Sequence, residues 1–132
     1  MKRGVIFGVF DLLHVGHVTV LNEAKKHCQH LTVYVITDKV VELYKRKPII
    51  EESQRLEMIR ALRMVDEGCL IDHRSPIDLQ EMDIYFVSER LRGKQLFYVP
   101  SHRMKDVIYL PYSEGINSTV LIARCRDLGL KD

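Results

Sequence analysis

Two histidines three residues apart stand in a glycine-containing segment near the start of the chain. At this spacing His14 and His17 share one face of a helix, and Gly16 between them has no side chain to block a ligand. Gly8, six residues before His14, leaves the backbone open to a phosphate or a sugar. The first residues of a helix also offer free N–H groups and positive partial charge to an anion. The segment from Gly8 to His17 therefore predicts a triphosphate site.

The elements that must position this segment follow from the apolar pattern. Residues 3–9 form a short apolar run typical of a buried strand, residues 14–28 have helical spacing, and residues 31–37 are apolar and β-branched. A strand, a helix and a strand in so short a stretch predict a βαβ unit with parallel strands. Ligands bind at the carboxyl ends of such strands, and Gly8 lies at the first of them.

The rest of the chain continues the alternation of helices and strands. Two further helices and three further strands are expected, at 51–63 and 117–128 and at 65–71, 83–87 and 107–110. No repeat, low-complexity tract or linker interrupts the pattern. The sequence therefore predicts a single domain over residues 1–132, with an α/β fold: a Rossmann-like, doubly wound parallel sheet of about five strands flanked by helices.

Composition argues against several classes of protein. The net charge of +2 over 132 residues supplies no basic field for a nucleic-acid partner. The three cysteines form no C-x-x-C pair, which argues against a disulfide framework or a zinc site and favours a cytoplasmic protein. The apolar run at the N-terminus is too short for a signal peptide or a membrane span, so no membrane partner is expected.

A metal centre is the first alternative, because His14 with His17 and His27 with His30 make two pairs. His17 and His27 are ten residues apart. That spacing is about 15 Å along a helix, too far for one four-ligand centre. No metal ligands are therefore expected from the protein.

Other polar residues stand where a phosphate site would need them. Asp38 follows the second strand, where it is equally suited to cap a helix, and Lys45 and Arg46 lie in a basic loop that ends in proline. Arg55 and Arg63 are eight residues apart, so on the expected helix they project from similar faces. In each case an ordinary cap or a solvated surface is the alternative interpretation.

The segment from Gly8 to His17 resembles the G-x-F-D-x-x-H-x-G-H signature of the cytidylyltransferase-like nucleotidyltransferases. This family includes glycerol-3-phosphate and choline-phosphate cytidylyltransferases, archaeal FAD synthetases and the adenylyltransferase that makes ADP-heptose. The resemblance covers nearly the whole chain, and the length suits the glycerol-3-phosphate enzymes best. It implies that His14 and His17 are catalytic. The nucleotide-binding residues that it implies in the same segment are Gly8, Val9, Phe10, Asp11 and Gly16.

Three further segments extend the resemblance. The basic loop matches one that closes over the phosphates, which implies catalytic roles for Lys45 and Arg46. Ser53-Gln54-Arg55 and Arg63-Met64-Val65-Asp66 resemble E-x-R…R-x-V-D, which implies phosphate contacts from Arg55 and a catalytic role for Arg63. Residues 109–119 resemble a segment containing R-T-E-G-I-S-T-T. The nucleotide-binding residues that this last match implies are Ser113, Asn117, Ser118 and Thr119, of which the last three are also strong N-cap types.

The chain departs from the family pattern at two places. Tyr112 replaces the arginine of R-T-E-G-I, and residues 88–91 replace the G-D-D-W of the glycerol-3-phosphate enzymes. Glu89 in that segment is still able to accept a hydrogen bond from an exocyclic amine, which cytosine and adenine both carry. Asp38 stands where the family has a Ser/Thr-Asp pair and is assigned to the acceptor substrate.

The resemblance implies transfer of CMP from CTP to a phosphorylated small alcohol like glycerol 3-phosphate, with release of pyrophosphate. The implied cofactor is Mg²⁺ bridging phosphate oxygens, and the implied assembly is a homodimer. One alternative is an adenylyltransferase that uses ATP, like the FAD synthetases or the ADP-heptose enzyme, which the Lys-Pro-Ile-Ile stretch at 47–50 resembles. The other is a catalytically idle nucleotide-binding relative that has lost the arginine at Tyr112.

Overall fold

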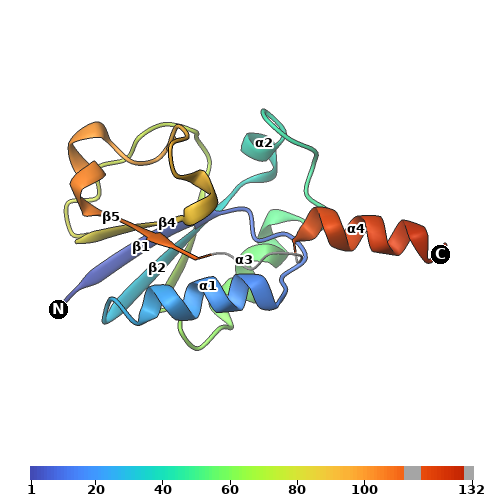
Figure 1. Cartoon of the computed structure of the whole chain (residues 1–132), viewed down its shortest axis with the longest axis horizontal. Helices are drawn as coiled ribbons and strands as arrows, with labels where there is room; N and C mark the ends of the chain where they lie inside the picture. Colours follow the sequence, from blue (N-terminus) through green and yellow to red (C-terminus); the bar gives the residue numbers. More distant parts are fainter. Residues whose placement is uncertain (112–116, 130–132) are drawn as a thin grey trace.

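The computed structural model describes residues 1–111 and 117–129. Within these residues five parallel strands form one sheet in the order β3-β2-β1-β4-β5 (Figure 1). The strands are β1 (Arg3–Gly8), β2 (His30–Ile36), β3 (Glu67–Ile71), β4 (Ile84–Ser88) and β5 (Val107–Leu110). The predicted α/β, Rossmann-like sheet is therefore confirmed.

Helices α1 (Val15–Lys25) and α3 (Glu52–Arg60) cover one face of the sheet. Leu21 of α1 and Ile59 of α3 are fully buried in the same cluster as Val33 of β2. Burying side chains of this size stabilises the fold by roughly 1.5–3 kcal/mol each. This packing holds α1 against the sheet with its N-terminus at the carboxyl end of β1.

The opposite face of the sheet is covered by α2 (Asp38–Val41) and by the segments that surround the 3₁₀-helix η2 (Ser101–Asp106). Its centre is an aromatic stack in which the ring of Phe7 lies 5.2 Å from that of Tyr34 and 4.7 Å from that of Tyr98. Helices therefore lie on both faces, as the doubly wound architecture requires.

The direction of the chain crossovers reverses between β1 and β4. From β1 the chain moves outward through α1 to β2 and through α3 to β3, and it then returns to the other side of β1 for β4 and β5. In open parallel sheets ligands bind outside the strand ends at such a switch point. Gly8 and Ser88, which end β1 and β4, mark that place in this sheet.

The last helix, α4 (Ser118–Asp127), projects away from the sheet (Figure 1). None of its residues is buried. It is tied to the domain at its start, where the hydroxyl of Ser118 donates to the backbone oxygen of Asp11. In the described part of the chain, none of the helices is both long and apolar enough to span a membrane.

Several element boundaries differ from the prediction. The helix expected over 51–63 ends at Arg60. The chain turns there because the buried Met64 packs into the core and the backbone N–H of Asp66 donates to Leu31 O, which starts β3 beside β2. Helices α2 and η2 were not predicted, since each is shorter than the window over which helical periodicity is visible.

Candidate active site

The histidine pair lies at the N-terminus of α1, and the backbone fixes both rings. His14 is the N-cap residue, and its Nδ1 accepts a hydrogen bond from Gly16 N at 3.0 Å. His17 Nδ1 accepts from His14 N at 3.1 Å, and the two rings stack with centroids 3.9 Å apart. Because each Nδ1 is an acceptor, each neutral ring carries its proton on Nε2. The pair therefore offers two Nε2–H donors, and hydrogen bonds to the backbone fix the orientation of both rings.

Both imidazoles are held neutral in the fold. The pKa of His17 is lowered to about 4, mainly by burial, with His14 and Arg90 also lowering it and Asp11 opposing them. Burial also lowers the pKa of His14. Stacked imidazolium ions would repel each other, whereas neutral rings can both donate to one anion near pH 7. The arrangement suits hydrogen bonding to phosphate oxygens.

Gly8 and Phe10 shape the turn between β1 and α1. A Cβ on Gly8 would lie 2.7 Å from the ring of Phe10. That ring meets His17 edge-on at 5.5 Å, and Phe10 itself has a positive φ of 54°. The ring of Phe10 fills the space that a Cβ on Gly8 would occupy, so glycine is required here for packing. The predicted approach of a phosphate to Gly8 stays a prediction.

Asp11 is buried and anchors the basic loop. Its carboxylate oxygens accept from Ile49 N at 2.8 Å and from Ile50 N at 2.9 Å, and Arg46 Nη1 lies 3.5 Å from Oδ2. Asp11 is only 4% exposed, and both of its carboxylate oxygens accept hydrogen bonds from backbone N–H groups of the protein itself. The structure therefore places Asp11 as a positioning residue and not in the direct nucleotide contact that was predicted.

Arg55 is the clearest departure from the predicted phosphate contacts. Its residue exposure is 1%, and its guanidinium donates to the backbone oxygens of Val9 at 2.7 Å, Ile36 at 2.9 Å and Ile50 at 2.9 Å. The remaining nitrogen, Nη2, pairs with Asp38 Oδ1 at 2.5 Å. The group joins the turn after β1, the end of β2 and the segment before α3 from inside the protein. The predicted contact with the phosphates stays a prediction, which this burial disfavours.

Asp38, assigned to the acceptor, is engaged by Arg55 and by α3. Its backbone N–H donates to Glu52 Oε1 at 3.0 Å, and its Oδ2 accepts from Glu52 N at 3.4 Å. These reciprocal bonds tie the first residue of α2 to the first residue of α3. The side chain is largely covered, with 20% exposure. Asp38 therefore does not cap its own helix, whose N-cap is Thr37, and its carboxylate binds the N-terminus of α3 instead. Its predicted role at the acceptor stays a prediction.

Lys45, Arg46 and Arg90 form the cationic side of the site. The Lys45 side chain is exposed along its length, yet burial around its amine lowers its pKa, as do Arg46 and Arg90, while Asp11 raises it. Arg90 acts on His17 as well. Arg90 therefore lies within electrostatic range of His17, and Lys45 lies within range of both Arg90 and Asp11. Arg90 was not predicted, although its place just after β4, at the switch point, is a usable signal.

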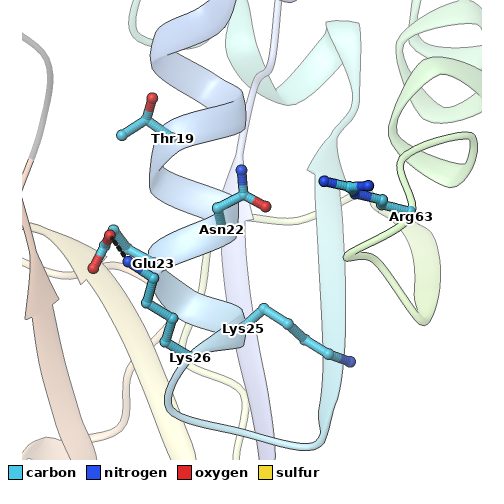
Figure 2. A pocket seen from close by; sticks show the side chains of 6 residues that line it. All are labelled: Thr19, Asn22, Glu23, Lys25, Lys26 and Arg63. Atoms are coloured by element: carbon cyan, nitrogen blue, oxygen red, sulfur yellow. Dashed lines mark hydrogen bonds and ion pairs between the residues drawn. The ribbon is translucent and has the colours of Figure 1, made fainter.

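Arg63 lies away from the histidine pair. It comes three residues after the end of α3. Figure 2 shows its side chain beside an open pocket along α1, whose other lining residues are Thr19, Asn22, Glu23, Lys25 and Lys26. Asn22 is eight residues beyond His14, or ~12 Å along a helix axis. Because α3 ends at Arg60, Arg63 is not on the same helix as Arg55. The prediction that the two arginines project from similar faces of one helix is therefore wrong.

Glu89 begins the short 3₁₀-helix η1 (Glu89–Leu91), immediately after β4. Its carboxylate accepts from Arg92 Nε at 2.5 Å and Nη2 at 2.9 Å, and this pairing lowers its pKa. The side chain is exposed. An ionised acceptor therefore stands at the carboxyl edge of the sheet, and its contact with the base amine stays a prediction.

The N-terminus of α4 contacts the segment from Gly8 to His17. Asn117 is the N-cap and accepts from Val120 N at 2.9 Å, as its residue type predicts. Ser118 contacts Asp11, and Thr119 is exposed. Ser113, also predicted to bind the nucleotide, lies outside the described residues, as does Tyr112. The start of α4 thus lies beside the turn that leads to the histidine pair.

Known proteins agree with this geometry. The sequence matches the family described as Cytidylyltransferase-like over residues 5–95. It is 37% identical over 123 residues to an FAD synthase of Picrophilus torridus, covering 93% of this chain and 74% of the relative. It is 36% identical over 131 residues to an FAD synthase of Ferroglobus placidus, covering 99% and 72%.

A solved structure has the same fold. It is described as the lipopolysaccharide core biosynthesis protein from Thermoplasma volcanium GSS1 and is 26% identical, with a TM-score of 0.60. The match covers 99% of this chain and 91% of the other. The likeness therefore extends over the whole described domain.

These relatives contradict the predicted transfer of CMP from CTP to an acceptor like glycerol 3-phosphate. They are named FAD synthases, and FAD contains adenosine and not cytidine. Chain length, which favoured the glycerol-3-phosphate enzymes, therefore does not identify the base. A nearest kinship to the glycerol-3-phosphate cytidylyltransferases is not confirmed. The chain belongs to the cytidylyltransferase-like family and is a nucleotidyltransferase.

Proposed function

We propose that the protein transfers AMP from ATP to FMN, forming FAD and pyrophosphate. The observation that carries this proposal is the 36–37% identity to FAD synthases over 93–99% of the chain. In the reaction a phosphate oxygen of FMN attacks the α-phosphorus of ATP, and the bond from that phosphorus to the bridging oxygen of the β-phosphate breaks. Pyrophosphate leaves with the electron pair, and no redox change occurs.

The histidine pair would hold the triphosphate as the α-phosphorus becomes five-coordinate. The Nε2–H groups of His14 and His17 donate to its oxygens without carrying charge of their own. The phosphate of FMN is already anionic near neutral pH, so no general base is needed to create the nucleophile. The rate enhancement then comes from positioning and from charge stabilisation, as in other phosphoryl and nucleotidyl transfers.

Three cations would balance the charge that develops on the phosphates. Lys45 and Arg46 belong to the loop that Asp11 anchors, and Arg90 follows β4. The partial desolvation of the Lys45 amine strengthens its attraction to an oxyanion. The hydroxyls and N–H groups at the start of α4, from Asn117 to Thr119, would meet the β- and γ-phosphates.

Mg²⁺ fits this site as part of the nucleotide substrate. In residues 1–111 and 117–129, no three His, Cys, Asp or Glu side chains gather into a metal site. The carboxylate of Asp11, near the histidines, already accepts two backbone N–H groups. Magnesium commonly binds through substrate phosphates and water, so the ion would arrive as MgATP and neutralise phosphate charge.

The choice of adenine would rest on the segment after β4. The ionised carboxylate of Glu89 is able to accept a hydrogen bond from the exocyclic amine of the base. Arg92 holds this carboxylate from one side through two hydrogen bonds. The amine alone does not separate adenine from cytosine, so the size of the purine must contribute to the choice.

The test is a product assay on the purified chain. ATP, Mg²⁺ and FMN should give FAD and an equal amount of pyrophosphate, while CTP in place of ATP should give little product. Pyrophosphate release that requires CTP would contradict the adenylyl assignment. Nucleotide binding without pyrophosphate release from any acceptor would identify an idle relative.

A sugar phosphate is the second candidate acceptor. The solved structure that shares this fold is described as a lipopolysaccharide core biosynthesis protein, and such cores are built from sugars. The same assay with a phosphorylated heptose in place of FMN separates the two acceptors. FAD formation with no heptose product favours the flavin.

The predicted homodimer remains a proposal. The described surface includes exposed apolar side chains near the β3 edge of the sheet, Met58 and Leu70, which are of the kind that a second copy covers. Light scattering on the eluted chain measures the mass directly, and a mass of one chain would contradict the dimer.

A further inference from the structure

Three residues from different loops form a flat stack at the rim of the site. The guanidinium carbon of Arg74 lies 4.1 Å from the centroid of the Tyr44 ring and 3.5 Å from that of Phe97. A guanidinium has two faces, and each face accommodates one ring. Tyr44 and Phe97 therefore flank Arg74, which occupies a slot suited to one flat group.

The slot lies at the edge of the sheet where ligands bind. Tyr44 follows β2 and α2, Arg74 follows β3, and Phe97 follows β4 and η1. Because the strands are parallel, their carboxyl ends share one edge with the end of β1. Tyr44 also directly precedes Lys45 of the cationic side. A group in the slot is therefore next to the loop that would hold the phosphates.

Tyr98 beside the slot has a buried hydroxyl with no partner. Its exposure is 9%, and its ring is fixed by stacking on Phe7 at 4.7 Å. No described residue makes a hydrogen bond to the hydroxyl. Burial raises its pKa to about 12, with opposing effects of Tyr44 and Arg74 that place the hydroxyl near both. A buried polar group without a partner costs free energy that a ligand is able to recover.

Arg74 is held in the slot weakly. Within residues 1–111 and 117–129 it forms none of the hydrogen bonds or ion pairs identified for other arginines, and its contacts are with the two rings. Tyr44, one of these rings, is 40% exposed. Phe97 is half-buried, but the contact of a cation with an exposed ring such as that of Tyr44 is among the weaker ones, so this arginine is replaceable.

We propose that the slot between Tyr44 and Phe97 binds the flat ring system of the acceptor, and that Arg74 fills it only in the absence of that ligand. The identity of the ring as the isoalloxazine of FMN rests on the proposed function. The ring displaces Arg74 and stacks between the two aromatic side chains, and its polar edge meets the hydroxyl of Tyr98. A sugar has no flat face for such a slot, so the slot selects a planar acceptor.

Flavin fluorescence gives a direct test, because stacking against tyrosine quenches it. FMN is titrated into the protein at a saturating concentration of a non-hydrolysable ATP analogue with Mg²⁺. Arg74→Ala should bind FMN ~3- to 10-fold more tightly, because no cation–π contacts need to be broken first. Tyr44→Ala and Phe97→Ala should each bind it ~3- to 10-fold more weakly.

Two further variants separate the slot from general effects on the fold. Tyr98→Phe keeps the stack on Phe7 and loses only the hydroxyl, so FMN affinity should fall ~2- to 10-fold at an unchanged melting temperature. Lys26→Ala removes an exposed cation at the far end of α1, where it pairs with Glu23, and should leave FMN affinity unchanged.

The outcomes distinguish the two proposals. If the wild type quenches FMN fluorescence and the variants at Tyr44 and Phe97 bind it equally well, the slot is refuted while the acceptor stands. If Arg74→Ala weakens binding as much as loss of either ring, Arg74 is a permanent part of the site and the displacement is wrong. If the wild type binds the ATP analogue but no FMN, the flavin acceptor and its slot both fail.

Discussion

The segment 8–17 and the loops that follow β2, β3 and β4 border the same site, but different interactions hold them. At the histidine pair of the first segment the contacts are local: His14 bonds Gly16, and His17 bonds His14. In the loops they are long-range. Asp11 holds the amides of Ile49 and Ile50, which are 38 and 39 residues away.

A short motif is therefore sufficient to arrange the histidines, whereas the loops are arranged only when the whole chain folds. The local segment presents neutral N–H donors to any triphosphate, so it is suited to every branch of the family. The loops bring together residues that no short spacing connects, such as Arg55 with Val9 and Arg74 with Phe97. We infer that phosphate chemistry depends on the first region and the choice of base and acceptor on the second.

The largest expected effect is on the stability of the loop region. Arg55→Met removes a fully buried cation and leaves Asp38 without its partner, so the free energy of unfolding should fall by about 3–5 kcal/mol. Urea unfolding followed by circular dichroism measures the change. The exposed Arg63→Ala should alter it by no more than ~0.5 kcal/mol. A stable Arg55→Met protein that has lost only ATP binding would restore the phosphate role.

The next effect concerns the local segment. In His17→Asn the amide oxygen is able to replace Nδ1 as acceptor from His14 N, but the Nε2–H donor is lost. We expect kcat to fall ~10²- to 10³-fold, the usual cost of one such donor, with little change in the circular dichroism spectrum. The exposed His27→Asn is the control. A kcat within a few-fold of wild type for His17→Asn would remove the histidine from the mechanism.

A smaller effect links the two regions through Asp11. Asp11→Asn keeps one acceptor oxygen, so one of the two amides of Ile49 and Ile50 loses its partner, at a cost of about 1–3 kcal/mol. Hydrogen exchange should speed up at these amides while the strands keep their protection. Asp106→Asn, in η2, should leave both amides unchanged. Unaltered exchange in Asp11→Asn would show that the loop holds its shape without the anchor.

The smallest effect is a pH dependence of stability from His17. Its pKa is about 4 in the fold and ~6.5 when unfolded, so between these values the unfolded chain binds more protons. Stability from this residue is therefore present above pH ~6.5 and is lost as the pH falls toward 4, with a slope of up to ~1.4 kcal/mol per pH unit. His17→Asn should lose that part of the slope, and His27→Asn should keep it. Equal slopes in wild type and His17→Asn would contradict the buried neutral ring.

The sheet and the histidine pair were predictable because their signals are local. Strand runs such as 31–37 and the strand-to-helix junction at Gly8 are visible in a few consecutive residues. The capping role of Asn117 followed from its residue type alone. These features require no knowledge of distant parts of the chain.

The roles of Arg55, Asp38 and Arg90 were not predictable in the same way. A helical arginine is normally exposed, and only the assembled fold shows that Arg55 points inward to three loop segments. Arg90 approaches the histidines because β4 lies next to β1, although the two are about 80 residues apart in the chain. Periodicity carries no information on either contact.

We propose that His14 and His17 are neutral Nε2–H donors to the triphosphate. Long-range ¹H–¹⁵N NMR spectra of the imidazoles report the tautomer of each ring directly. We expect Nε2–H tautomers for both, no protonation of His17 until pH approaches about 4, and shifts of both Nε2–H signals when MgATP is added. An Nδ1–H tautomer, titration of His17 near pH 6.5, or signals unmoved by MgATP would contradict it.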